Sequence, residues 1–209
     1  MEEINYTFIL LSALAVIASP GPATLAIAAT SMNYGRYNGV SLALGVVCGS
    51  FIWSVTAALG LATLVNGNIW ILDIMKYCGA AYLLFLAYKS IRSIIYPTKL
   101  VMYQGCTLSF KQFYFKGLMI HITNPKAILF FSSIYSIGIP KGSDITDLLT
   151  VIISIGMISV TVFISYAILF SNRLLRIIYF KLKNYFEAIF FVLFGIAGTG
   201  VIIDGINKY

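Results

Sequence analysis

The chain has 209 residues, of which 60% are hydrophobic and only 10% are charged, and its mean hydropathy is +0.93. Soluble domains carry roughly 45–50% apolar and about 25% charged residues. Because so few charges cannot cover a water-facing surface, the chain is an integral membrane protein. A soluble enzyme and a nucleic-acid-binding module are excluded, and we expect no nucleic-acid partner. The net charge of +7 is expected to mark cytoplasmic loops instead.

Six stretches are long and apolar enough to span a membrane as helices, which need about 20 residues each. None has the strict alternation of a transmembrane β-strand. The predicted fold class is therefore an all-α integral membrane protein with six transmembrane helices. The expected spans are residues 5–32, 38–64, 69–92, 113–139, 145–170 and 185–206.

The longest connection, residues 93–112, divides the single domain 1–209 into two parts of three spans each, residues 1–92 and 113–209. Three spans are an odd number, so the second part is expected to enter the membrane the opposite way up.

Charge is distributed unequally between the two sides of the predicted bundle. The connections after spans one, three and five hold ten lysines and arginines against one acidic residue, Glu187. The opposite side holds three cations and six acidic residues. Positive loops face the cytoplasm, so 93–112 is predicted to be a cytoplasmic loop and both termini are predicted to be external.

Proline residues interrupt spans one and four. Pro20, Gly21 and Pro22 lie inside the first span, and Asn124 and Pro125 lie inside the fourth. Each proline removes a backbone hydrogen bond and clashes with the preceding turn. Both helices are therefore expected to break, with the freed carbonyl groups turned toward protein or a water-filled cavity.

The two breaks are 104 residues apart, about half of the chain. Prolines are common in membrane helices, and that alone is one interpretation. Interrupted helices at matching places in two inverted repeats instead indicate a transporter binding site, and the matched positions favour this interpretation.

Lys126 is the only cation well inside a predicted span. Charges there are costly and usually functional, and a lysine beside the start of a half-helix could bind an anion such as a carboxylate. The alternative is that its side chain reaches the cytoplasmic membrane surface. The substrate-binding residues predicted from the breaks are Pro20, Gly21, Pro22, Asn124, Pro125 and Lys126.

Four segments together carry a family resemblance. They are Ser19-Pro20-Gly21-Pro22; Tyr34-Gly35-Arg36-Tyr37-Asn38-Gly39 with the later Gly45 and Gly49; Gly79-Ala80-Ala81-Tyr82-Leu83; and Gly117 followed by Thr123-Asn124-Pro125-Lys126-Ala127. With these segments in this order, the chain resembles the LysE/RhtB family of bacterial amino-acid exporters, in particular its RhtB-like branch. Glu187 departs from the less acidic start expected of the last helix.

The resemblance implies a multi-pass inner-membrane exporter of neutral amino acids or their derivatives, similar to homoserine, threonine or leucine. It also implies alternating access driven by the ion gradient of the membrane. The protein is then not an enzyme, and its partners are a small amino-acid substrate and the lipid bilayer.

Gly45 and Gly49 form a GxxxG pair, which lets two helices approach closely. The contact could lie inside the bundle or between two copies of the chain as a homodimer. His121 is the only histidine and could carry a proton, although a lone histidine more often has a structural role. The 14 tyrosines are expected mostly at the membrane interfaces.

A membrane thiol-disulfide electron-relay protein is the alternative function. The three cysteines, Cys48, Cys78 and Cys106, form neither a CxxC pair nor a metal-ligand spacing, and none lies in a break. No metal or cofactor is expected.

The acidic residues also predict substrate charge. All seven lie near span ends or in connections as the spans are drawn. A cationic side chain would then enter the site without a fixed counter-anion, which is costly. This argument predicts neutral amino acids over lysine or arginine.

Overall fold

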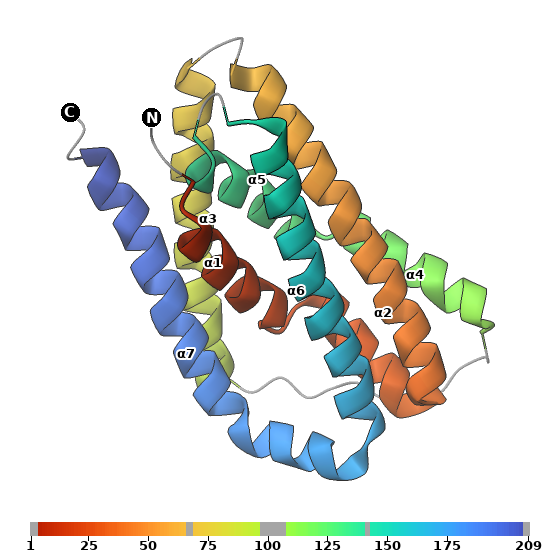
Figure 1. Ribbon diagram of the computed structural model, residues 1–209. Coiled ribbons are helices and arrows are strands. Elements are labelled where there is room, and N and C mark those ends of the chain that lie inside the picture. The colour runs from red at the N-terminus through yellow and green to blue at the C-terminus, as the bar shows by residue number, and fades with distance from the viewer. Residues whose placement is uncertain (1–3, 66–68, 97–107, 141–142, 207–209) are drawn as a thin grey trace.

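The computed structural model describes residues 4–65, 69–96, 108–140 and 143–206, and within them every regular element is an α-helix. The elements are α1 (Tyr6–Ala18), α2 (Pro22–Val65), α3 (Ile69–Ile95), α4 (Phe110–Ile122), α5 (Pro125–Gly138), α6 (Ile145–Ser171) and α7 (Arg173–Ile206). Figure 1 shows them as one elongated bundle.

Both breaks expected from the prolines are present. The first predicted span is interrupted between α1 and α2, and the fourth is interrupted between α4 and α5. The helices α1, α4 and α5 have only 13 or 14 residues each, which is less than a spanning helix needs. None of these short helices can cross the membrane alone, so each broken span needs the helical segments on both sides of its break.

The helix α2 contains the end of the first predicted span and all of the second. Its backbone leaves the helical conformation at Gly35, where φ is +81° and ψ is 174°. A positive φ suits glycine because it has no Cβ. Residues 22–34 and 36–65 are therefore two helical segments that meet at Gly35.

Three stretches of the described helices contain a window long and apolar enough to cross a membrane: Pro22–Gly60, which includes the change of direction at Gly35, Ile145–Ser171 and Lys181–Ile203. The other predicted spans, and their arrangement as two inverted repeats, stay predictions. The helix α7 starts at Arg173 and first runs across the lower end of the bundle in Figure 1. The apolar stretch that can form the last span begins further along this helix, at Lys181.

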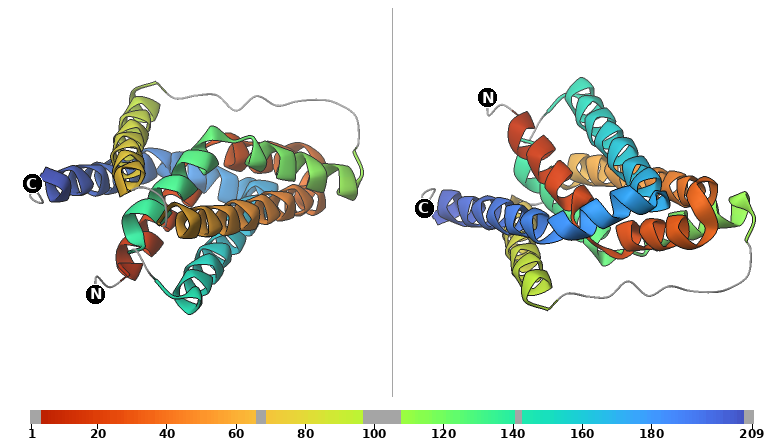
Figure 2. Two further views of the ribbon diagram at one scale, coloured as in Figure 1. Left: turned by 90° about the horizontal axis from the view of Figure 1, so that it is seen from above. Right: turned by 90° about the horizontal axis from the view of Figure 1, so that it is seen from below.

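The helices form two packed groups. The helix α2 packs against α4 and α6, while α3 packs against α7. Figure 2 shows these groups on opposite sides of the bundle. The two half-helices α1 and α5 contact members of both groups, so the segments next to the breaks lie between them.

Close contact between α2 and α4 depends on two glycines. A Cβ on Gly45 would overlap the carbonyl oxygen of Tyr114, and a Cβ on Gly117 would overlap the carbonyl oxygen of Leu42. Each glycine thus lets the backbone of the other helix approach, as small residues do in membrane bundles.

We expect Gly45→Ala and Gly117→Ala to destabilise the protein, because the added methyl groups would push two backbones apart. The cost of such overpacking is about 1–3 kcal/mol. Thermal unfolding in detergent measures the effect as a lower Tm. Gly195→Ala is the matched control, because a Cβ there meets nothing within 4 Å. Equal Tm values for all three variants would contradict the packing argument.

Candidate functional site

The first break is stabilised by local hydrogen bonds. The helix α1 ends at Ala18, and Ser19 is extended with φ −69° and ψ 144°. The Gly21 amide donates to Thr24 Oγ1 over 2.8 Å, and the Thr24 hydroxyl donates back to the Gly21 carbonyl over 3.1 Å. Thr24 therefore satisfies both polar backbone groups of Gly21 and fixes the start of α2, which begins at Pro22.

The second break is capped by Asn124. Its Oδ1 accepts a 3.0 Å hydrogen bond from the Lys126 amide, and Pro125 occupies the first position of α5. Asparagine is a favourable N-cap, and proline suits the first turn because its missing N–H would be unpaired there anyway. Asn124 and Pro125 thus fix the start of α5, two residues after the end of α4 at Ile122.

Lys126 connects the two breaks. Its ammonium donates to the Ser19 carbonyl over 2.8 Å and to Ser19 Oγ over 2.6 Å, although 107 residues separate the two positions. The side chain therefore points to the other break and not to the membrane surface. Gly21 leaves room for it, since a Cβ there would lie 3.1 Å from Lys126 Cδ.

Two tyrosines complete the hydrogen bonding of the breaks. Tyr166 donates to the Ala18 carbonyl over 2.7 Å, and Tyr82 donates to the Lys126 carbonyl over 3.3 Å. Neither tyrosine was among the predicted site residues, because tyrosine is common at membrane interfaces. The signal that could have found them is the set of carbonyl groups that the prolines free, which must accept hydrogen bonds from some side chain.

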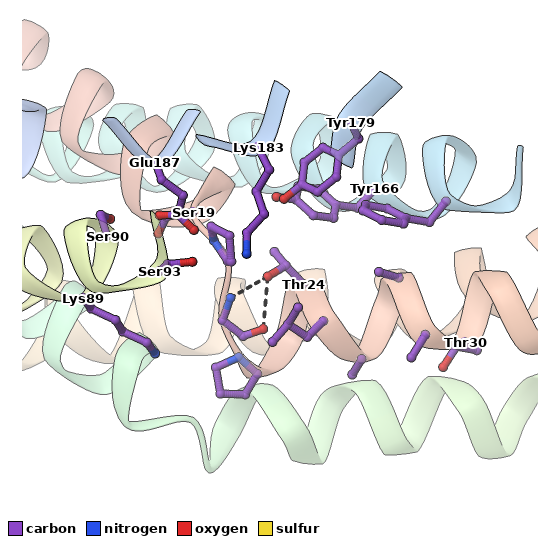
Figure 3. Close-up of a pocket in the computed structure, with 18 of the residues that line it drawn as sticks. Ser19, Thr24, Thr30, Lys89, Ser90, Ser93, Tyr166, Tyr179, Lys183 and Glu187 are labelled. Carbon is purple, nitrogen blue, oxygen red and sulfur yellow. Dashed lines mark hydrogen bonds between the residues drawn. The ribbon is translucent and has the colours of Figure 1, made fainter. Parts of the chain in front are cut away.

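A cavity of about 810 Å³ begins at the first break and is lined by the start of α2, the end of α3, and parts of α4, α6 and α7. Pro20, Gly21 and Pro22, three of the residues that the sequence predicted to bind substrate, line this cavity. Most of its lining is apolar, with hydroxyl groups of Ser19, Thr24, Ser90 and Ser93 among the polar ones. Figure 3 shows Ser19 in the break, Thr24 at the start of α2, and Ser90 and Ser93 on α3.

Charged residues also line this cavity, namely Lys89, Arg92, Lys116, Lys183 and Glu187. Glu187 is only 2% exposed. The expectation that no acidic group would face the site is therefore wrong. The reason is that α7 begins at Arg173, so Glu187 lies four turns inside a long helix, whereas hydropathy alone had placed it at the start of the span.

The residues of the second break border a different space. Asn124 and Lys126 line a small adjoining pocket of about 30 Å³. Gly21 and Thr24, which belong to the first break, also line this pocket. Pro125 is exposed and lines neither space. The structure thus brings the six predicted site residues to one region but divides them between two pockets.

His121 is buried beside the small pocket. Its Nε2 lies 3.0 Å from Ser50 Oγ, and its ring packs edge-on against Phe163. Its Nδ1 makes no hydrogen bond to any residue that the structure describes. Gly49 makes space for this ring, since a Cβ there would lie 2.9 Å from His121 Cβ.

Gly45 and Gly49 therefore both face α4 of the same chain. The contact that the GxxxG pair predicted lies inside the bundle, and these glycines give no reason to expect a homodimer.

No disulfide joins the two cysteines that the structure describes. Cys48 on α2 and Cys78 on α3 are both free thiols, and Cys106 lies outside the described residues.

The comparisons with known proteins decide between transport and thiol chemistry. Residues 14–201 match the family described as LysE type translocator. The chain belongs to the LysE family. It is therefore a transporter and not an enzyme, and its apolar helices agree with a multi-pass protein of the inner membrane.

Several relatives of this LysE family chain carry functional names. It is 34% identical over 135 residues to a leucine efflux protein of Salmonella typhimurium. The aligned region makes up 63% of this chain and 62% of that protein. It is 28% identical over 127 residues to a threonine efflux protein of Escherichia coli, with 58% and 60% covered.

The longest of these alignments covers an uncharacterised membrane protein of Escherichia coli, YahN. It is 28% identical over 192 residues, which is 91% of this chain and 85% of YahN. The alignments with the leucine and threonine efflux proteins span less than two thirds of their length. No solved structure matches the chain.

We expect the Lys126 contact to stabilise this LysE family protein by joining its two parts. In a double-mutant cycle of Lys126→Met and Ser19→Ala, the two losses of stability should not be additive, because each variant removes the same hydrogen bond. A coupling of about 0.5–3 kcal/mol is expected for residues in contact, measured from the unfolding of the purified protein in detergent.

Lys126→Met should also cost more than Ser19→Ala, because the Ser19 carbonyl stays available as an acceptor in the serine variant. Strictly additive losses would contradict the contact.

Proposed function

We propose that the chain exports neutral amino acids from the cytoplasm, and that the cavity at the first break holds the substrate. The observation that carries the proposal is this 810 Å³ cavity, which ends at a broken helix of a LysE family protein. Broken helices commonly supply polar backbone groups to transporter substrates. Pro20, Gly21 and Pro22 are the break residues that reach the cavity.

We assign a supporting role to the second break. Asn124 and Pro125 fix the start of α5, and Lys126 holds the two breaks together through Ser19. These residues shape the site from the adjoining pocket.

The orientation of the cavity agrees with export. Its basic residues belong to the connections that the positive-inside rule places in the cytoplasm. An exporter takes up its substrate from that side, so this arrangement corresponds to an inward-facing state. Alternating access then requires closure of this side and opening of the other.

The packing agrees with two inverted repeats. Span two of the first repeat corresponds to span five, and span three corresponds to span six. The helices that hold these pairs, α2 with α6 and α3 with α7, pack against each other. Such contacts are compatible with a two-fold axis that passes between the corresponding helices.

We also propose that transport is coupled to the ion gradient, with His121 as the candidate proton carrier. Its buried ring has one nitrogen without a partner among the described residues, and it lines the pocket next to both breaks.

Counterflow in proteoliposomes tests the substrate. Labelled leucine and threonine should accumulate in liposomes preloaded with the same amino acid, and lysine should accumulate at a tenth of that rate or less. The physical reason is that four cations and one carboxylate line the cavity, so a second positive charge on the substrate would be repelled. Protein-free liposomes are the control. Lysine exchange without leucine or threonine exchange would contradict the proposal.

Reporter fusions test the topology. Fusions at residues 100 and 178 should read cytoplasmic, whereas fusions at residues 67 and 142 and at the C-terminus should read external. In Figure 1 the C-terminal ends of α2 and α7 lie at one end of the bundle and the junction of α6 with α7 at the other. A cytoplasmic C-terminus would overturn the orientation or the number of spans.

A further inference from the structure

Two opposite charges line the cavity from successive turns of α7. Lys183 and Glu187 are four residues apart, so their side chains leave the helix on the same face, and both line the cavity at the first break. Figure 3 shows Lys183 directed toward the break beside Thr24, and Glu187 directed toward Ser19 and Ser93. The predicted site residues included neither of them.

These two charges are not neutralised by each other. Figure 3 draws no hydrogen bond to either side chain, and Glu187 lies within electrostatic range of the Lys126 ammonium without a direct contact to it. A carboxylate that is 2% exposed without a cation in direct contact is costly. A positive charge on a molecule in the cavity would lower this cost by contacting Glu187 directly.

We propose that Lys183 and Glu187 bind the two charged groups of a zwitterionic amino acid. Glu187 accepts hydrogen bonds from the substrate ammonium, and Lys183 donates to the substrate carboxylate. Both groups of an α-amino acid are attached to one carbon atom, and four residues of helix, a rise of about 6 Å, separate the backbone positions of Lys183 and Glu187 along α7. A ligand between them can therefore reach both.

This assignment differs from the one that the sequence favoured for the substrate carboxylate. The Lys126 ammonium is already bonded to two oxygen atoms of Ser19, and it lines the small pocket instead of the large cavity. Lys183 is the cation that shares a helical face with the buried carboxylate. The inference rests on the proposed function, because it names the groups that hold the proposed substrate.

Substrate analogues that each lack one charge test the inference. Leucine, isocaproate (leucine without its amino group) and isopentylamine (leucine without its carboxylate) compete with labelled leucine in counterflow by the full-length protein. We expect the wild-type protein to prefer leucine to either analogue by at least about tenfold, the effect of 1.4 kcal/mol.

Each variant should abolish one preference only. Glu187→Gln should bind leucine and isocaproate equally, because the ammonium has lost its partner. Lys183→Gln should bind leucine and isopentylamine equally. Glu187→Asp keeps the charge and should keep part of the preference over isocaproate. Lys181→Gln, an exposed neighbour on α7, and Asp144→Asn, whose side chain makes no capping hydrogen bond, are the matched controls and should behave as wild type.

Other results would overturn the inference. If Glu187→Gln weakens leucine and both analogues equally, or leaves all three unchanged, Glu187 does not bind the ammonium. If it leaves exchange intact but abolishes uptake driven by a pH gradient, the residue carries protons instead. If Lys89→Gln removes the preference over isopentylamine and Lys183→Gln does not, the assignment of Lys183 is wrong.

The same experiment separates this inference from the proposed function. Wild-type protein that exchanges no neutral amino acid contradicts the proposed function and the inference with it. Wild-type exchange of leucine with unchanged Glu187 and Lys183 variants contradicts the inference alone.

Discussion

The structure depends on the need to satisfy backbone polar groups at two helix breaks within an apolar bundle. Membrane interiors offer no water to an unpaired carbonyl group, so a break is tolerated only where protein groups replace the lost hydrogen bonds. Thr24 does so within the first break, Tyr166 donates to the carbonyl of Ala18, and Lys126 donates to Ser19. The donors come from three different helices, and this requirement brings those helices together.

The same requirement leaves a cavity beside the first break. Two short helices cannot fill the space of one continuous helix, and α1 and α5 lie between the group of α2, α4 and α6 and the pair of α3 and α7. The remaining space is lined by an apolar surface, a few hydroxyl groups and an excess of positive charge. A small zwitterion has chemistry that suits these walls, whereas a large apolar or strongly cationic molecule does not.

The sequence predicted the positions of the breaks, because proline and glycine act locally. It could not decide what Lys126 does, because a long flexible side chain can reach either a membrane surface or a distant backbone. It misplaced Glu187, because hydropathy marks where an apolar stretch starts and not where a helix starts. It also missed Tyr82 and Tyr166, since the position of a hydroxyl group relative to a distant carbonyl depends on tertiary packing.

Substitutions at the two ends of the contact between Lys126 and Ser19 have different effects on its hydrogen bonds. One end of the contact is a lysine side chain, and no other residue type offers an ammonium of that reach. The other end includes a main-chain carbonyl, which every amino acid possesses. A substitution at position 19 that keeps the extended backbone therefore keeps one of the two hydrogen bonds, whereas a substitution at position 126 removes both.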